Sequence, residues 1–195
     1  MRQATVERNT LETRITLTLA LDGAGEGLIK TGCGFLDHML TLLGKHALMD
    51  LSVSCQGDNM VDDHHTVEDV GICLGQALRQ ALGNKRGIRR FGDCALPMDE
   101  ALVLVAADLS GRAALQYAMQ IPTQKVGTFD TELVEEFFGA LCREAGITLH
   151  IRQLCGHNSH HLIEAAFKGF ARALREAASV DERLGDALPS TKGSL

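Results

Sequence analysis

Tryptophan is absent from this chain of 195 residues, and aromatic side chains make up only 4% of it. We therefore expect a core built mainly from leucine, valine, isoleucine and alanine. No run of about 18 apolar residues occurs, so a membrane-spanning helix is not expected. The first residues, MRQATVERNTLETR, lack the apolar segment of a secretory signal. The length suits one domain or two small, intimately packed halves.

The chain also lacks an excess of positive charge and lacks closely paired cysteines. Its formal net charge of −6 argues against a nucleic-acid-binding surface but leaves room for a local basic pocket that binds a small anion. The six cysteines form no CxxC pair, which disfavours a structural zinc knot or a dithiol redox motif. We expect them to be small buried side chains of a cytoplasmic protein.

Strand-like alternation and helical spacing of apolar residues follow one another along the chain. The predicted strands are TRITLTLALDG (13–23), MDLSVSCQGD (49–58), ALVLVAADLSGR (101–112) and ITLHIRQLC (147–155). The predicted helices lie in 32–48, 62–83, 131–146 and 159–179. The second is expected to be capped by Asp62 or Asp63 and to end at Gly83. The third is expected to be capped by Asp130 or Thr131 and to end at Gly146. We expect a connector at 84–100 and a polar tail at 186–195 that is extended or mobile without a ligand.

The order strand–helix–strand–helix thus occurs twice, and both halves contain HHxxE at the start of their second helix. Aligning His64 with His160 also matches Leu78 with Leu174 and repeats Ala and Arg on either side of them. We predict an α+β fold with two similar halves, about 1–92 and 93–180, plus a tail, 181–195. The helices should cover one face of the sheets, and the halves should pack around a pseudo-twofold axis. A helical solenoid is less favoured, because each half contains alternating segments.

The repeated HHxxE motif has the spacing of a metal site. Residues i and i+4 share a helix face, so His64 and Glu68 can bind one ion, while the adjacent His65 points elsewhere. A single histidine at a helix start is more often a cap or a surface residue, but two matching copies favour metal binding. Exchange of ligands between the halves, or between neighbouring subunits, predicts one site with His64, Glu68, His161 and Glu136 and another with His160, Glu164, His65 and His38. A mixed nitrogen and oxygen donor set with open positions suits manganese or iron as well as zinc.

Several basic side chains interrupt apolar or small-residue contexts and could grip a phosphate. Arg112 follows the strand end at DLSGR, Lys168 lies one turn after Glu164, and the tail segment PSTKG contains hydroxyls and an amine. Taken one by one, such residues are more often solvated charges. The other histidines have simpler explanations: His46 lies at a helix end, His150 on the polar face of a strand and His157 in a loop.

The motifs resemble the imidazoleglycerol-phosphate dehydratase family. The resemblance runs in unbroken order from about residue 4 to the C-terminus, through GFLDHML, DDHHTVEDVGICLGQAL, RRFG, DLSGR, PTQKVGTFDTELVEEFF, ITLHIRQLCGHNSHHLIEAAFKGFARALR and PSTKG. It implies two ferredoxin-like repeats of the ribosomal S5 domain 2-like type, the single-function form without a fused phosphatase, and trimers that assemble into 24 subunits with metal sites between them.

The resemblance also implies a manganese-dependent lyase of histidine biosynthesis, with two Mn²⁺ ions per subunit and a small phosphorylated imidazole as substrate. The implied metal ligands are His38, His64, His65, Glu68, His160, His161 and Glu164, with Glu136 at a position that is histidine in some members. The implied substrate contacts are Glu12, His46, Arg90, Arg112, Lys168, Ser190 and Lys192, and Glu12 is the candidate acid–base group. We expect the two ions to favour an imidazolate form of the ring, whose electrons help to expel the neighbouring hydroxyl.

Two other classes of protein fit the histidine–carboxylate pattern. A di-metal hydrolase would use the same ligands on a phosphoester or an amide. A metal-storage or metal-sensing assembly would need no phosphate pocket, and the basic residues Arg112, Lys168 and Lys192 argue mildly against it.

Overall fold

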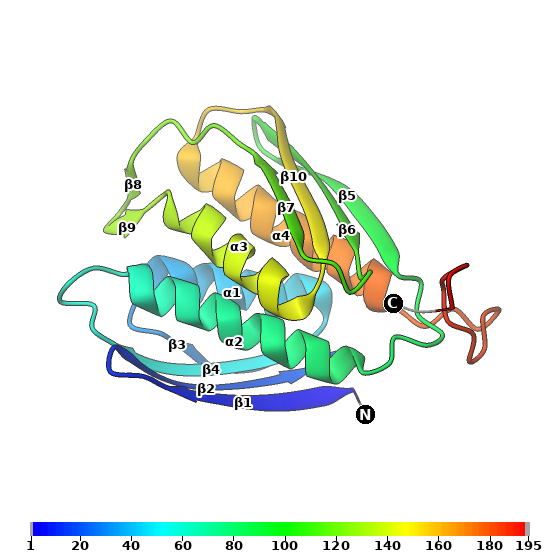
Figure 1. Cartoon of the computed structure of the whole chain (residues 1–195). Helices are drawn as coiled ribbons and strands as arrows, with labels where there is room; N and C mark the ends of the chain where they lie inside the picture. Colours follow the sequence, from blue (N-terminus) through cyan, green and yellow to red (C-terminus); the bar gives the residue numbers. More distant parts are fainter. Residues whose placement is uncertain (1, 194–195) are drawn as a thin grey trace.

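Each half of the chain builds one sheet and one pair of helices (Figure 1). The computed structural model describes residues 2–193. The first half contains β1 (Gln3–Asn9), β2 (Thr13–Ala20), β3 (Ile29–Lys30), α1 (Gly34–Ala47), β4 (Asp50–Gly57) and α2 (His64–Leu82). The second contains β5 (Phe91–Met98), β6 (Ala101–Asp108), β7 (Ala114–Ala118), β8 (Lys125–Val126), β9 (Phe129–Asp130), α3 (Leu133–Ala145), β10 (Thr148–Cys155) and α4 (Ser159–Ala178).

The two four-stranded sheets have the same topology. Their strand orders are β1-β2-β4-β3 and β5-β6-β10-β7, and in each sheet the first three strands are antiparallel while the last is parallel to its neighbour. The helices lie between the sheets, with α2 against α3 and α1 against α4 (Figure 1). The predicted α+β fold with two repeats and helices on one face of each sheet is therefore confirmed, and β8 and β9 form a separate small hairpin.

The predicted connector at 84–100 is wrong, because it contains the edge strand β5, and the edge strand β1 was also missed. Only two residues of β5, Gly92 and Leu96, are buried, so its apolar alternation is weak. Gly92 lies directly against α4, where an added Cβ would come 2.2 Å from the carbonyl oxygen of Ala173. Glycine and proline ordinarily disfavour a strand, but Pro97 is tolerated at a sheet edge, where its missing N–H breaks no central ladder.

The helix ends follow the predictions in part. Asp63 is the N-cap residue of α2, and Asp62 Oδ1 accepts a hydrogen bond from the His64 N–H at 2.8 Å. The N-cap of α3 is Glu132 instead of either predicted residue. Thr131 Oγ1 instead donates to the carbonyl of Thr123 at 2.7 Å, which ties the β8–β9 hairpin to the start of the helix. Gly83 and Gly146 end their helices as predicted.

The core is mainly aliphatic, as predicted, and also contains a cluster of aromatic side chains. Four of the seven phenylalanines, Phe137, Phe138, Phe167 and Phe170, pack together between α3 and α4, with ring centroids 4.9–5.5 Å apart along the chain of contacts. The first half buries aliphatic side chains and Met39 instead. Of the six cysteines, four are buried as expected, whereas Cys94 is partly exposed and Cys155 is exposed.

The C-terminal segment is held against the connection between the two halves. Val180 pairs with Ile88, and the Gly87 N–H donates to the Ala187 carbonyl at 2.9 Å. The described part of the predicted tail therefore forms hydrogen-bonded turns instead of an extended strand, and its last two residues, 194–195, lie outside the described range. None of the helices within residues 2–193 combines the length and apolar character needed to cross a membrane.

Candidate active site

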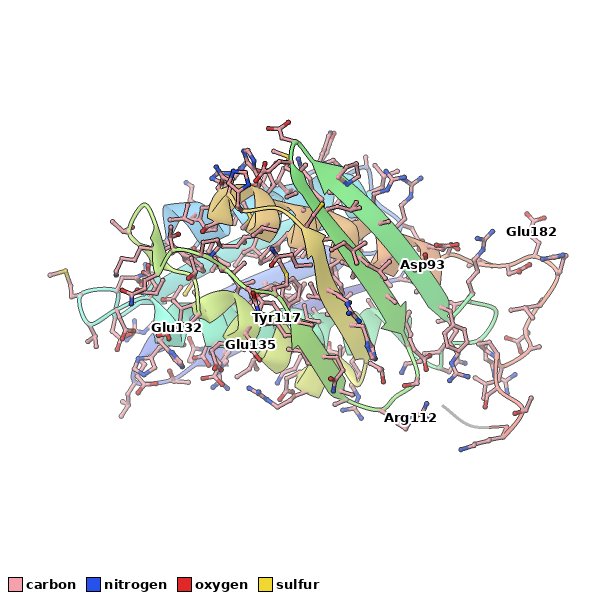
Figure 2. All side chains as sticks on the ribbon, turned by 90° about the horizontal axis from the view of Figure 1, so that it is seen from above. Asp93, Arg112, Tyr117, Glu132, Glu135 and Glu182 are labelled. Atoms are coloured by element: carbon pink, nitrogen blue, oxygen red, sulfur yellow. The ribbon has the colours of Figure 1, made fainter. Side chains whose placement is uncertain are left out.

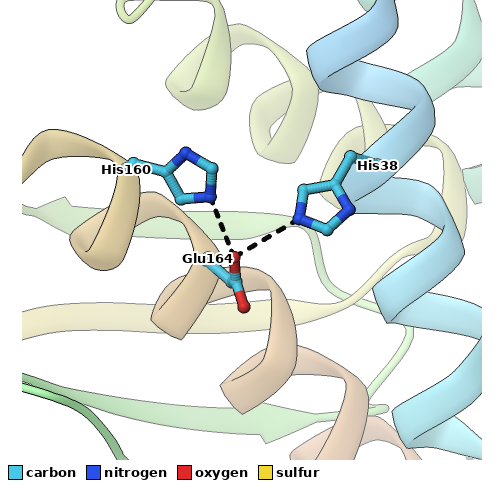
Figure 3. A group of neighbouring side chains, drawn as sticks. All are labelled: His38, His160 and Glu164. Carbon is cyan, nitrogen blue, oxygen red and sulfur yellow. Dashed lines mark hydrogen bonds and ion pairs between the residues drawn. The ribbon is translucent and has the colours of Figure 1, made fainter.

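Three side chains from two helices meet where α1 crosses the start of α4 (Figure 3). Glu164 Oε2 lies 3.0 Å from His160 Nε2 and 3.4 Å from His38 Nε2, and ligand atoms of the three residues lie within 4.8 Å of one another. His160 and Glu164 share a face of α4 because they are four residues apart. The His38 and His160 side chains are nearly half exposed, while the Glu164 side chain is 8% exposed. This arrangement offers two nitrogens and a carboxylate to one cation, a donor set that divalent transition metals accept.

Two further side chains of the implied substrate set lie around this cluster. Lys168 Nζ forms an ion pair with Glu164. Burial alone would raise the pKa of Glu164, but hydrogen bonds from Lys168 and His160 outweigh it and lower that pKa. His46 is half-buried near Lys168 and Arg172, and its pKa is lowered by burial first and then by these two cations. This shift favours the neutral form of His46.

The first HHxxE motif lies at the start of α2. His64 Nε2 is 4.0 Å from Glu68 Oε2, and Glu68 accepts a hydrogen bond from Arg143 of α3 at 3.0 Å. Glu136, the ligand predicted from α3, is exposed, and it forms no ion pair with any residue in 2–193. The chain by itself therefore does not bring Glu136 and His161 to His64. Among the described residues, His38, His160 and Glu164 are the only three potential ligands whose donor atoms all lie within 4.8 Å of one another.

The second histidine of each motif faces two carboxylates. His65 Nδ1 lies 3.0 Å from Asp58 Oδ2, and its Nε2 lies 3.6 Å from Glu12 Oε1. His161 Nδ1 lies 2.7 Å from Glu100 Oε2, and its Nε2 lies 3.7 Å from an oxygen of Asp99. These contacts raise the pKa of both histidines, chiefly through the hydrogen bond at Nδ1. His65 is consequently not part of the cluster around Glu164 within one chain, although it was assigned there.

Sequence reasoning missed Asp58 and Glu100. The hydrogen bond from His161, joined by backbone N–H groups of Asn158 and His157, lowers the pKa of Glu100 to about 2. Asp58 stands seven residues before His65 and Glu100 stands in a turn far from His161 in sequence, so no fixed spacing marks these carboxylates. Glu100 lies in the segment that was expected to be a connector.

The basic residues divide between two ends of the molecule. Arg90 donates to both carboxylate oxygens of Asp108, at 2.7 and 3.1 Å, and to the Pro189 carbonyl at 2.9 Å. Arg112 is 3.7 Å from the same carboxylate and lies at the end of the second sheet toward the tail (Figure 2). The Lys192 N–H donates to Ser190 Oγ, so both tail residues lie in the same turn. Asp108 was not singled out from the sequence, although it opens the DLSGR motif.

Arg90 has an unusual backbone conformation. Its φ of +72° is rare for a residue with a side chain, and such strain persists only where the surroundings hold it. Here its N–H donates to the Ala177 carbonyl at 2.8 Å and its own carbonyl accepts from Leu109 at 3.0 Å. These bonds fix the Arg90 backbone beside the last turn of α4, while Asp108 and the Pro189 carbonyl hold its guanidinium.

The two clusters lie at opposite ends of α4. A helix rises about 1.5 Å per residue, so Ala177, which anchors Arg90, is about 25 Å along the axis from His160. In Figure 1 both α2 and α4 begin at the end of the molecule away from the C-terminus. The histidine clusters and the Arg90–Arg112 cluster of one chain are therefore too far apart to contact one small molecule, whereas Lys168 lies on the histidine side.

The comparisons with known proteins agree with one another. A family model described as imidazoleglycerol-phosphate dehydratase matches residues 31–174. The imidazoleglycerol-phosphate dehydratase of Jannaschia sp. (strain CCS1) is 60% identical over 195 residues and covers 100% of both chains, and that of Synechococcus sp. (strain WH7803) is 57% identical over 100% of this chain and 96% of its own.

Solved structures give the same result. The crystal structure of imidazoleglycerol-phosphate dehydratase from Staphylococcus aureus subsp. aureus N315 aligns with a TM-score of 0.84 and 42% identity, over 92% of this chain and 99% of that one. The enzyme from Pyrococcus furiosus, crystallised in complex with (S)-C348, aligns with a TM-score of 0.85 and 39% identity, over 97% and 100%. This chain therefore belongs to the imidazoleglycerol-phosphate dehydratase family and is a dehydratase of the lyase class.

Proposed function

We propose that the chain dehydrates D-erythro-imidazole glycerol phosphate to imidazole acetol phosphate with the help of two divalent metal ions. Family membership carries the dehydration itself, as a step of histidine biosynthesis. The single observation that supports the metal-dependent form is the convergence of His38, His160 and Glu164, whose donor atoms lie within 4.8 Å of one another. A hydrolase or a metal-storage role has no comparable support.

The remaining histidine and carboxylate ligands would complete two sites between neighbouring copies of the chain. His38, His160 and Glu164 supply three donors to one ion, and the first HHxxE motif supplies His64 and Glu68 to the other. His65, His161 and Glu136 would then reach the sites of an adjacent subunit, because none of them belongs to the triad of its own chain. Mixed imidazole and carboxylate donors fit Mn²⁺.

The arrangement of charges also favours a site shared between copies. The substrate is a five-membered ring joined through three carbons to a phosphate, so it is far shorter than the distance of about 25 Å along α4 between the two clusters. Arg90 and Arg112 of one chain would therefore hold the phosphate of a substrate whose ring lies at the histidines of another. We propose self-association of this kind, as trimers that assemble into a 24-mer.

The reaction needs help because the hydrogen that is lost lies on a carbon without an adjacent carbonyl and is not acidic. The metal ions, when bound, act as Lewis acids that favour the imidazolate form of the substrate ring and fix its orientation. Glu12 lies in the turn between β1 and β2, 3.6 Å from His65, and would move a proton at the carbon or at the departing hydroxyl. His46 and Lys168 would contact the substrate near the triad, and Ser190 and Lys192 would close over the phosphate.

A direct assay tests this proposal. The purified protein, loaded with Mn²⁺, is incubated with imidazole glycerol phosphate, and the enol of the product is followed by its absorbance in alkali. We expect product with manganese and a large loss of activity after chelation, with recovery on adding Mn²⁺ back. Full activity of metal-stripped protein would contradict the role of the ions but not the dehydration. Absence of product from folded, metal-loaded protein would contradict both the dehydration and the role of the ions.

A further inference from the structure

The two pseudo-equivalent histidines, His65 and His161, contact a carboxylate through the same ring atom. Nδ1 of His65 lies 3.2 and 3.0 Å from the two oxygens of Asp58, and Nδ1 of His161 lies 2.7 Å from Glu100 Oε2. All four side chains are about one-quarter to one-third exposed, so the contacts lie at the molecular surface but are not free in solvent.

A carboxylate at Nδ1 determines which nitrogen of the ring is left to bind something else. An ionised carboxylate only accepts hydrogen bonds, so Nδ1 must carry the proton. The neutral ring then exposes the lone pair of Nε2, which is the atom available to a metal ion. Histidine ligands of metal ions characteristically donate their other N–H to a carboxylate or a carbonyl, which fixes the orientation of the ring and makes the ligand more basic.

The two carboxylates come from different places in the two repeats. Asp58 follows β4, and the corresponding position of the second half follows β10. Glu100 lies in the turn between β5 and β6, which corresponds to the turn between β1 and β2. Copying of one repeat from the other therefore does not account for both pairs. In both histidines the carboxylate within hydrogen-bond distance is the one at Nδ1, whereas the carboxylates near Nε2, those of Glu12 and Asp99, are 3.6 and 3.7 Å away.

The two carboxylates are also held to different degrees. Glu100 Oε1 accepts the N–H groups of Asn158 at 2.8 Å and His157 at 3.2 Å, so the loop before α4 fixes its position. The described contacts of the Asp58 carboxylate are with His65 alone. Substitution of Asp58 therefore perturbs the histidine with little effect on the surrounding backbone.

We propose that Asp58 and Glu100 are positioning residues that keep Nδ1 protonated on His65 and His161 and aim Nε2 of each ring at a divalent cation. This inference rests on the metal-dependent function proposed above. An amide in place of either carboxylate can donate to Nδ1 as well as accept from it. The ring is then free to carry its proton on Nε2, where it blocks the metal.

The test measures Mn²⁺ binding to the full-length protein without substrate, by equilibrium dialysis of wild type, Asp58→Asn and Glu100→Gln. Asp93→Asn and Glu182→Gln are matched controls that remove one exposed negative charge away from both histidines (Figure 2). We expect each site variant to bind Mn²⁺ about 10–100-fold more weakly than wild type, the usual effect of losing such a partner, and each control to bind as wild type does. Asp58→Glu, which keeps a carboxylate, should bind closer to wild type than Asp58→Asn.

The outcomes separate this inference from the proposed function. Wild-type protein that binds no Mn²⁺ would overturn both. Wild-type binding together with unchanged affinity in Asp58→Asn would overturn the inference and leave the metal-dependent function intact. Glu100 also holds the loop before α4, so Glu100→Gln could fail to fold. In that case the result for Asp58→Asn decides whether the inference stands. Equal weakening in Asp58→Asn and Asp58→Glu would show a structural effect and would also overturn it.

Discussion

His38 and Glu164 are 126 residues apart in sequence, yet His38 Nε2 lies 3.4 Å from Glu164 Oε2. The contact joins α1 of the first repeat to α4 of the second, so the triad exists only when the two halves are packed together. Binding of a cation there is expected to stabilise that packing, since a ligand that binds only the folded state shifts the equilibrium toward it.

Glu164→Gln should reduce the manganese content. The substitution keeps the size of the side chain but removes the charge that faces His38, His160 and Lys168. We expect the loss of one bound ion per chain, measured by metal analysis after dialysis. The melting temperature should fall further in Mn²⁺ than in chelator, where only the ion pair with Lys168 is lost. Glu182→Gln, in an exposed turn near the C-terminus, is the control (Figure 2). A full complement of ions in Glu164→Gln would exclude this carboxylate as a ligand.

Glu12→Gln should separate catalysis from binding. Glu12 lies in the turn between β1 and β2, with its side chain about half exposed and near His65. Loss of an acid–base group lowers turnover by about 10²-fold or more. We expect kcat to fall by this factor while the manganese content and the KM change little. A kcat close to that of wild type would remove Glu12 from the mechanism.

Arg112→Met should weaken binding of the phosphate. The Arg112 side chain is 65% exposed and 3.7 Å from Asp108, so its removal leaves the fold intact. We expect a KM higher by about 10-fold or more, in keeping with the loss of a charge-assisted hydrogen bond, and little change in inhibition by imidazole, which has no phosphate. Parallel weakening of substrate and imidazole would show that Arg112 does not act on the phosphate.

His46→Gln should reduce the loss of stability in acid. Burial, with Lys168 and Arg172, lowers the pKa of His46 below its ordinary value of 6.5. The unfolded chain then binds this proton more readily than the folded chain, so the free energy of unfolding falls as the pH drops from about 6.5 through the folded pKa. Urea unfolding of chelator-treated protein should show a smaller decrease for His46→Gln than for wild type between about pH 7 and pH 5. Equal decreases would contradict the assignment.

Gly75→Ala should destabilise the contact between the two repeats. A Cβ at Gly75 on α2 would meet the Leu141 carbonyl oxygen at 2.7 Å and the Ala145 nitrogen at 3.1 Å on α3, so backbone would have to move. Overpacking of this kind costs about 1–3 kcal/mol, measurable as a lower denaturation midpoint. Gly139→Ala is the control, because its Cβ would meet only side-chain atoms, of Arg143 at 3.4 Å and of Leu115 at 4.0 Å, and alanine favours a helix. A midpoint for Gly75→Ala as high as for Gly139→Ala would show that the helices can separate freely.

The repeated pattern of apolar residues was enough to predict the main helices and the central strands. Helical spacing in 159–179 and alternation in 147–155 each follow from local geometry, and they match α4 and β10 closely. The edge strand β1 escaped prediction because only Ala4 and Val6 in it are buried, and β5 escaped because Gly92 and Pro97 ordinarily break strands. The cap of α3 was missed because Thr131 forms its hydrogen bonds with the preceding hairpin.

The sequence by itself determined the family, the double-repeat fold and the identity of most candidate ligands, since HHxxE places two donors on one helix face by local geometry alone. Only the tertiary structure decided which donors meet. It joined His38 to Glu164, turned His65 toward Asp58 and His161 toward Glu100, and separated Arg90 from the triad by the length of α4. Such relationships depend on how helices and turns distant in sequence pack together, and no spacing along the chain encodes them.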